Sequence, residues 1–186
     1  MKKIMVDMDD VICDGGFLKI INEFLGTNYN NDSTTTFYRQ DLIPKERQKE
    51  WEKFFCTKNI YDEAEFLPNA YETMKKLSKY YELYIGTGYI FRGNEYYSGI
   101  NLKNKYNWLK ENISFIPPEN YLFITNKELI NCEIKIDDML HNLKGNTETK
   151  LLFTAYHNKN LTEEEIKEVG AIRVNGWKEI ENRLLK

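Results

Sequence analysis

Short apolar runs rich in β-branched residues recur along this chain and alternate with segments of helical periodicity. Such runs, bounded by glycine, proline or asparagine, are typical of buried strands in a parallel sheet. Their alternation with helices favours an α/β fold with a three-layer, Rossmann-like and mostly parallel sheet. The expected strands are 2–8, 81–85, 121–125, 132–136, 150–154 and a short 171–174, and the expected helices are 17–25, 44–55, 69–77, 102–111 and 177–185.

The region from residue 15 to 66 departs from this alternation, because it carries helical patterns but no run typical of a strand. We therefore expect a small helical cap inserted after the first strand. The expected organisation is an α/β core of residues 1–14 and 68–186, with residues 15–67 forming the cap. A chain of 186 residues is long enough for one such core and a modest insertion. Asn69 is expected to cap the helix that follows it.

Composition excludes several classes of function. Hydrophobic residues make up 41% and charged residues 30%, the net charge is −3, and no basic stripe of the kind that binds duplex nucleic acid is present. Cys13, Cys56 and Cys132 lack the spacing of a disulfide framework or a zinc cluster. Two histidines, His141 and His157, cannot form a His-rich metal site and have no expected triad partner. Without a signal peptide or a long apolar run, we expect a cytoplasmic protein with neither nucleic-acid nor membrane partners.

The residues at the expected strand ends carry the chemical information. In an open parallel sheet, ligands bind at the carboxyl ends of the strands. The polar residues there are Asp7, Asp9 and Asp10 after the first strand, Thr87 and Gly88 after the second, Lys127 after the third, and Asp137 and Asp138 after the fourth. Packing does not require polar groups at one shared edge, so we predict that they form a single site.

Clustered carboxylates with a lysine and a hydroxyl suit phosphoryl transfer. A carboxylate nucleophile, here Asp7, can divide hydrolysis into formation and breakdown of an aspartyl phosphate. Because a carboxylate repels a phosphate dianion, a hard cation is needed, and Mg²⁺ prefers such oxygen ligands. Asp9 lies where the strand gives way to a turn, so its carbonyl can reach the metal and its side chain the leaving oxygen. Crowded carboxylates would let Asp9 start protonated as a general acid.

The chain resembles the haloacid dehalogenase (HAD) superfamily of phosphohydrolases in four ordered motifs. These are DMDDVI from Asp7 to Ile12, Thr87 after YELYIG, Lys127, and Asp137-Asp138 after IKI. Within the superfamily it is most similar to the 5′(3′)-deoxyribonucleotidases. The similar stretches are VDMDDVICD, KYNWLKENI, the ten-residue step from Lys127 to Asp137, FTAYHN at 153–158, and NGWKEIENRLL. The resemblance implies Mg²⁺-dependent dephosphorylation of nucleoside monophosphates, with a preference for the deoxy sugar.

The resemblance also implies roles for the matched residues. Asp7 would be the nucleophile and a metal ligand, and Asp9 the acid/base, with its backbone carbonyl on the metal. Asp138 would be the third protein ligand, while Asp137 would orient the lysine or a metal-bound water. The phosphate would be held by Thr87, Gly88 and Lys127, with Lys105 as a second positive group.

The sequence departs from the family at three places. Asp10 stands where the nucleotidases commonly have glycine, and Gly88 replaces a frequent serine. The family usually places a base-stacking phenylalanine directly after the first motif, whereas here Phe17 follows two glycines. Phe17, Phe37 and Tyr38 lie beside loops and are the expected base-stacking residues. The other cap aromatics are expected to fill a small helical core.

Three functions remain open from sequence. The first hypothesis is a nucleotidase that binds a small phosphomonoester, namely a (deoxy)nucleoside monophosphate. A homodimer is compatible with this hypothesis. The second keeps the chemistry but takes a sugar phosphate or another small phosphometabolite. The third is a catalytically idle module that senses phosphate. This alternative is disfavoured because every catalytic position is filled by a suitable residue.

Overall fold

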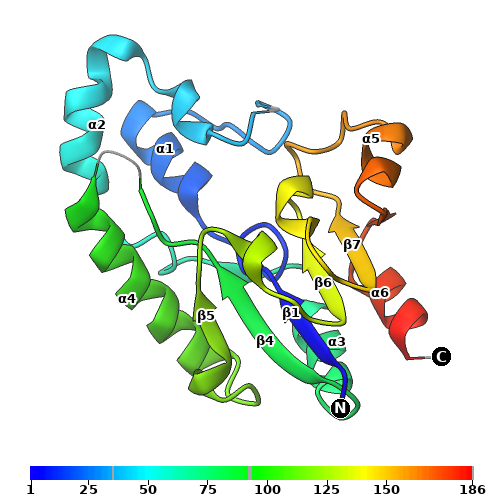
Figure 1. The fold of residues 1–186 in the computed structure, drawn as a ribbon. Coiled ribbons are helices and arrows are strands. Elements are labelled where there is room, and N and C mark those ends of the chain that lie inside the picture. The colour runs from blue at the N-terminus through cyan, green and yellow to red at the C-terminus, as the bar shows by residue number, and fades with distance from the viewer. Residues whose placement is uncertain (35, 92–93, 186) are drawn as a thin grey trace.

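The computed structural model describes residues 1–34, 36–91 and 94–185. Its main sheet is parallel throughout, with the strand order β5-β4-β1-β6-β7-β8 (Figure 1). The strands are β1 (Lys3–Val6), β4 (Glu82–Thr87), β5 (Tyr121–Phe123), β6 (Ile134–Asp137), β7 (Thr149–Phe153) and β8 (Ala171–Val174). A parallel sheet with helical crossovers confirms the expected α/β class.

Strand register aligns the ends of the three central strands. Val6 of β1 pairs with Ile85 of β4 on one side and with Ile136 of β6 on the other. These apolar residues are buried on both sheet faces, which is why the three strands read as continuous hydrophobic runs. Because the three strands are parallel and aligned at these residues, their carboxyl ends lie at one common edge of the sheet.

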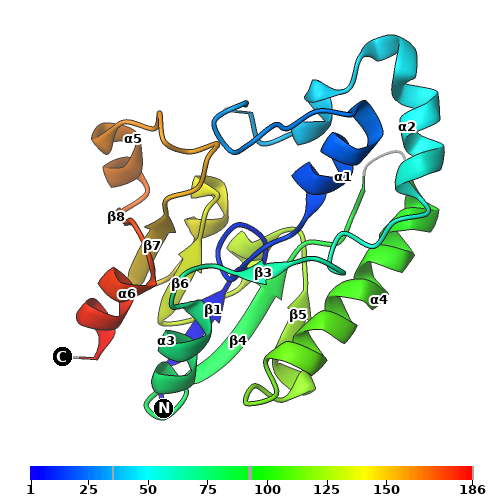
Figure 2. The ribbon, with the colours of Figure 1, turned by 180° about the vertical axis from the view of Figure 1, so that it is seen from behind.

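Helices pack around this sheet. α3 (Ala70–Leu77) and α6 (Trp177–Leu184) lie side by side on one face (Figure 2). α4 (Glu95–Asn112) runs beside β4 and β5, and the short α5 (Glu163–Glu168) precedes β8. No helix in the described parts of the chain combines the length and apolarity needed to cross a membrane.

Several helix boundaries differ from the sequence expectation. α4 begins at Glu95 instead of residue 102, because the Asn94 side chain accepts a hydrogen bond from the Tyr97 N–H and caps the first turn. α5 is an unpredicted helix, although the capping box of Thr162 and Glu165 marks its start. The expectation for Asn69 was wrong: its side chain makes no capping bond, and it adopts φ 63°, a left-handed conformation that asparagine tolerates.

The insertion after β1 is joined to the sheet by a short ribbon. β2 (Cys13–Asp14) pairs antiparallel with β3 (Glu65–Phe66), so the two ends of the insertion lie together. Between them are α1 (Phe17–Leu25), α2 (Gln48–Phe55) and the 3-10 turns Arg39–Leu42 and Lys45–Arg47. Strands of two residues are too short to show an alternating hydrophobic pattern in the sequence. For this reason the sequence of this region predicts helices only. In both ribbon views α1 and α2 lie beyond the carboxyl ends of the strands.

Trp177 connects the C-terminal helix to the loop after β1. Its indole is buried, and its Nε1–H donates to the Val11 carbonyl at 2.7 Å. The bond holds the turn that follows Asp10 against the core, and thereby helps to fix the start of the insertion.

Gly16 begins the insertion in a conformation that only glycine adopts easily. Its φ is +61°, and a Cβ there would lie 2.6 Å from the Ile60 carbonyl oxygen. We expect Gly16→Ala to lower the free energy of unfolding by about 2–4 kcal/mol, from left-handed strain plus overpacking. The matched control is Gly26→Ala, where φ is +67° but no atom lies within 4 Å, so strain alone costs about 1–2 kcal/mol. Equal losses in urea denaturation would contradict a packing role for Gly16.

Candidate active site

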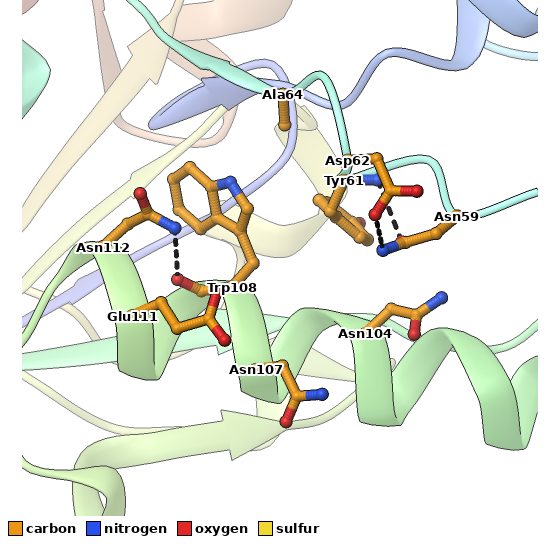
Figure 3. A pocket seen from close by; sticks show the side chains of 9 residues that line it. All are labelled: Asn59, Tyr61, Asp62, Ala64, Asn104, Asn107, Trp108, Glu111 and Asn112. Atoms are coloured by element: carbon orange, nitrogen blue, oxygen red, sulfur yellow. Dashed lines mark hydrogen bonds between the residues drawn. The ribbon is translucent and has the colours of Figure 1, made fainter.

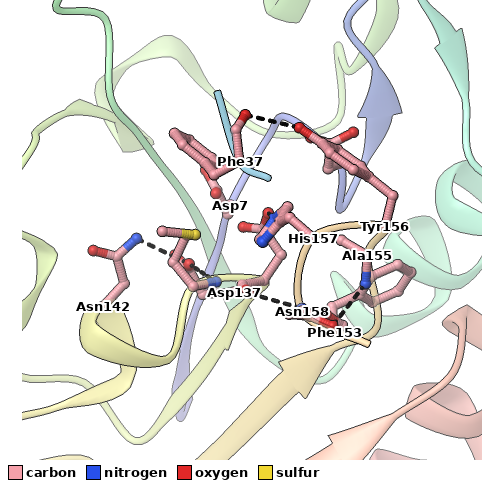
Figure 4. A network of polar contacts seen from close by, with 12 residues as sticks. Asp7, Phe37, Asp137, Asn142, Phe153, Ala155, Tyr156, His157 and Asn158 are labelled. Carbon is pink, nitrogen blue, oxygen red and sulfur yellow. Dashed lines mark hydrogen bonds and ion pairs between the residues drawn. The ribbon is translucent and has the colours of Figure 1, made fainter. Parts of the chain in front are cut away.

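Acidic residues from β1 and β6 meet at the carboxyl edge of the sheet (Figure 4). Asp7 directly follows β1, and its backbone N–H donates to the Ile136 carbonyl at 2.9 Å, which fixes the strand end against β6. Asp137 ends β6 and Asp138 follows it. All three carboxylates are buried, and one oxygen from each lies within 4.8 Å of the others. Burial, together with the neighbouring acid Asp137, raises the pKa of Asp7 to about 6.

Lys127 supplies a buried positive charge to this cluster. It follows β5, and its Nζ lies 2.7 Å from Asp7 Oδ1 and 2.8 Å from Asp137 Oδ2. Burial alone would lower the pKa of Lys127, but the two carboxylates raise it above its usual value, so the side chain stays an ammonium. The second oxygen of Asp137 accepts from the Met139 N–H and from Asn142 Nδ2, each at 2.9 Å. Both oxygens of Asp137 therefore accept hydrogen bonds from protein donors, and Asp137 orients the lysine.

Asp138 is held by the loop after β7. His157 Nε2 lies 2.6 Å from Asp138 Oδ2, and Asn158 Nδ2 donates to the Asp138 carbonyl at 2.8 Å. Burial and then the charge of Arg39 lower the pKa of His157 to about 4, so the imidazole is neutral where it shares a hydrogen bond with the Asp138 carboxyl group. Sequence motifs alone gave His157 no partner, although its position after the fifth strand was a signal. Hydrogen bonds of this kind orient metal-binding carboxylates.

A second lysine contributes to the same edge from α4. Lys105 is buried, its Nζ contacts Asp9 Oδ2, and it donates to Thr87 Oγ1 at 2.6 Å. Thr87 is the last residue of β4, and the half-exposed Gly88 follows it. The Tyr61 hydroxyl donates to the other oxygen of Asp9, Oδ1, at 2.7 Å. Burial, and then the charge of Asp9, raise the pKa of Tyr61 well above its usual value, so the phenol remains a donor.

Asp10 explains one departure from the family and reveals a contact from the insertion. Its φ of 58° is left-handed, which is the reason that glycine suits this position elsewhere. Arg39 Nη2 lies 3.3 Å from Asp10 Oδ1, and the guanidinium stacks 4.1 Å from the Tyr156 ring centroid. Burial raises the pKa of Asp10 to about 7, against the lowering effect of Arg39. No sequence motif singles out Arg39, because its contact depends on how the insertion folds back.

The three candidate stacking residues lie in two settings. Phe17 is half-buried within the insertion, where its ring meets that of Trp51 edge-on at 5.9 Å. Phe37 and Tyr38 are exposed, at 45% and 48% of their surface. The Phe37 ring also meets the His157 ring edge-to-face at 5.2 Å, which places it beside the acidic cluster (Figure 4).

A separate cavity of about 380 Å³ lies between the 59–64 loop and α4 (Figure 3). Its lining is mostly polar and includes Asn59, Tyr61, Asn104 and Asn107. The strand-edge carboxylates and lysines do not line it, and Tyr61 alone belongs to both the cavity wall and the contacts of Asp9. The candidate catalytic groups therefore lie at the strand edge and not in this cavity.

Comparison with known proteins decides the family. The sequence model of the family described as "5′ nucleotidase, deoxy (Pyrimidine), cytosolic type C protein" matches residues 1–186. The chain belongs to this family. The 5′(3′)-deoxyribonucleotidases of Bacillus subtilis strain 168 and of Bacillus phage SPbeta are each 30% identical to it over 194 residues, covering 100% of both chains. The chain is thus a phosphatase of the deoxyribonucleotidase-like type, as the resemblance indicated.

Solved structures show the same fold. A haloacid dehalogenase-like hydrolase from Streptococcus pneumoniae superposes with a TM-score of 0.58 at 14% identity, covering 98% of each chain. A HAD-hydrolase from Bacillus subtilis bound to magnesium gives 0.57 at 14% identity and the same coverage. Both confirm the HAD-like fold of this nucleotidase-family chain.

The acidic cluster of this phosphatase fits a divalent cation. Asp7, Asp137 and Asp138 bring three carboxylates together in a buried space where Lys127 supplies the adjacent positive charge. Burial, and then the charge of Asp7, raise the pKa of Asp138 well above its usual range. Buried like charges are costly unless a cation offsets them, and oxygen donors of this kind suit a hard divalent ion.

Proposed function

We propose that this phosphatase hydrolyses nucleoside monophosphates, with a preference for the deoxy sugar, through Mg²⁺ and an aspartyl phosphate on Asp7. The observation that carries the proposal is Lys127, which bridges Asp7 and Asp137 at the strand edge beside the buried Asp138. Membership of a deoxyribonucleotidase family supports the substrate class.

In this proposal Mg²⁺ is held by the carboxylates of Asp7 and Asp138 and by the Asp9 backbone carbonyl. When bound, the ion neutralises charge on the phosphate and so reduces its repulsion of the nucleophile. Asp137 is not a free ligand, because protein donors occupy both of its oxygens. The neutral His157 keeps Asp138 oriented through the hydrogen bond between its Nε2 and Asp138 Oδ2.

The chain's own residues then carry the reaction in two steps. Asp7 attacks phosphorus while Asp9 gives a proton to the leaving oxygen, so one P–O bond forms as the other breaks. Asp9, now a carboxylate, takes a proton from the water that attacks the aspartyl phosphate, so the new O–P bond forms as the bond from Asp7 to phosphorus breaks and inorganic phosphate is released. Lys127, Lys105, Thr87 and the backbone at Gly88 hold the transferring oxygens throughout.

We also propose that residues 15–67 act as a cap over a core of residues 1–14 and 68–186. The β2–β3 ribbon is the junction, and Arg39 reaches from the insertion to Asp10. The exposure of Phe37 and Tyr38 near the acidic cluster supports their role in stacking on the base, whereas the Phe17 ring packs against Trp51 within the insertion.

A panel of phosphomonoesters tests the substrate class. We expect kcat/KM for deoxyuridine 5′-monophosphate to exceed that for glucose 6-phosphate by about 100-fold or more, because a base-binding cap discriminates against a ligand without a base. The ribonucleotide uridine 5′-monophosphate should lie between them. Turnover should require added Mg²⁺ after chelation and dialysis.

Similar rates on the sugar phosphate and the deoxynucleotide would instead favour a phosphatase of small phosphometabolites. Hydrolysis that persists without a divalent ion would contradict the metal assignment. An absence of turnover on every ester would point to the phosphate-sensing module.

A further inference from the structure

Tyr61 is a residue of the insertion whose hydroxyl reaches an acid of the core. It lies in the segment just before β3, is 4% exposed, and donates to Asp9 Oδ1 at 2.7 Å. We propose that Tyr61 is a positioning residue for proton transfer, which fixes the Asp9 carboxyl so that Oδ2 faces the leaving oxygen. The inference rests on the proposed function, because it assigns a partner to the general acid/base.

The surroundings of Asp9 distinguish its two oxygens. Oδ1 meets the Tyr61 hydroxyl, and a Cβ at Gly15 would lie 3.3 Å from it, so the start of the insertion passes close to this oxygen. Oδ2 contacts Lys105, which also donates to Thr87 at the end of β4. Oδ1 is therefore enclosed by the insertion, whereas Oδ2 faces the proposed phosphate-binding groups.

The backbone around Tyr61 is held against the start of the insertion. The Tyr61 N–H donates to Asn59 Oδ1 at 3.1 Å. The preceding carbonyl, of Ile60, sits so close to Gly16 that no Cβ fits between them. This segment continues into β3, which pairs with β2. The backbone that carries the Tyr61 side chain is therefore held in place on both sides of Tyr61.

The consequence is that Tyr61 anchors Oδ1, while Oδ2, which pairs with Lys105 in this structure, becomes the oxygen for chemistry when the Lys105 ammonium turns to the phosphate. In the first step the proton on Oδ2 passes to the leaving oxygen as the P–O bond breaks. In the second step Oδ2 takes a proton from the attacking water. Tyr61 keeps its own proton in both steps and only restricts rotation of the carboxyl, which is the role of a positioning hydrogen bond.

Leaving-group dependence separates this role from simple packing. Expulsion of a nucleoside alkoxide needs the proton from Asp9, whereas p-nitrophenolate leaves without one. For Tyr61→Phe we expect kcat/KM to fall about 10- to 100-fold on deoxyuridine 5′-monophosphate, the range for loss of a hydrogen bond to a charged group. On p-nitrophenyl phosphate we expect a change within about threefold. Turnover of that ester also reports that the variant is folded.

Two further variants complete the test. Tyr97→Phe is the matched control, because Tyr97 is also buried and donates to the Lys58 carbonyl of the insertion at 3.2 Å, with no acid as its acceptor. It should leave the ratio between the two esters unchanged. In an Asp9→Asn background, Tyr61→Phe should add no further loss, because the two residues act as one unit.

Equal losses on both esters in Tyr61→Phe would overturn the inference and show that Tyr61 only supports the cap or binds substrate. Additive losses with Asp9→Asn would overturn it as well. In either case an active wild-type enzyme leaves the proposed function standing. If the wild type hydrolyses neither ester, the proposed function fails and the inference fails with it.

Discussion

Asp7→Asn is expected to lower kcat on deoxyuridine 5′-monophosphate by about 10⁴-fold or more, because the amide cannot attack phosphorus. The substitution keeps the shape of the side chain at the end of β1. The substitution also removes one of three crowded carboxylates. Burial raises the pKa of Asp7 to about 6, which means that its charged form is costly in the folded protein. The free energy of unfolding of the metal-free protein should therefore not decrease. Turnover and urea denaturation measured on one preparation check both statements.

The control for this variant is Asp14→Asn. Asp14 lies in β2, only seven residues along the chain, but it faces Arg39 at 3.8 Å and not the acidic cluster. Its loss should change kcat only a few-fold. A phosphorylated aspartate trapped by acid quenching of the wild type, and absent in Asp7→Asn, would identify the nucleophile directly. Retention of more than a tenth of the wild-type rate in Asp7→Asn would place the nucleophile elsewhere.

The strand-edge residues could be predicted because their signals are local. Each central strand is a hydrophobic run, and the polar residue that follows it lies at the carboxyl edge whatever the loops do. That rule located Asp7, Thr87, Lys127 and Asp138 before any contact was known, and the parallel pairing of β5, β4, β1 and β6 shows why they meet. His157 also follows a strand, β7, but it received no role from the sequence because no motif or partner marked it.

Contacts across the insertion could not be predicted, because they depend on how two segments far apart in sequence are placed. Tyr61 read as one of many aromatics filling the cap, yet its hydroxyl reaches Asp9, 52 residues earlier in the chain. Arg39 belongs to no sequence motif, although it is buried against Tyr156. Periodicity detects which residues are apolar, but a hydroxyl or a guanidinium at the end of a buried side chain leaves no periodic trace.

Lys127→Met is expected to reduce both catalysis and stability. The lysine is 3% exposed and is placed between Asp7 and Asp137, so its loss leaves two buried carboxylates without a cation. We expect the free energy of unfolding of the metal-free protein to fall by about 3–5 kcal/mol, as for other broken buried ion pairs. We expect kcat to fall by about 10²- to 10³-fold, because a fixed positive charge on the transferring phosphate is lost.

Lys150→Met is the control for the stability term. Lys150 is partly buried in β7 and donates to the Val169 carbonyl at 3.0 Å, away from the acidic cluster. Since only one hydrogen bond to a neutral group is lost, a destabilisation of about 1 kcal/mol with unchanged kcat is expected. A comparable loss of stability in both variants would show that the pairing with Asp7 and Asp137 is not what matters at Lys127.

Mg²⁺ separates the two effects of Lys127→Met. Without the ammonium, the carboxylates of Asp7 and Asp138 attract a divalent ion more strongly, so added Mg²⁺ should raise the melting temperature of the variant more than that of the wild type. Catalysis should not recover in parallel, because the ion offsets the charge on the carboxylates but does not replace the Nζ donor to the phosphate. Parallel recovery of kcat would mean that Lys127 acts only by keeping the acidic cluster folded, and it would remove the lysine from the proposed phosphate-binding groups.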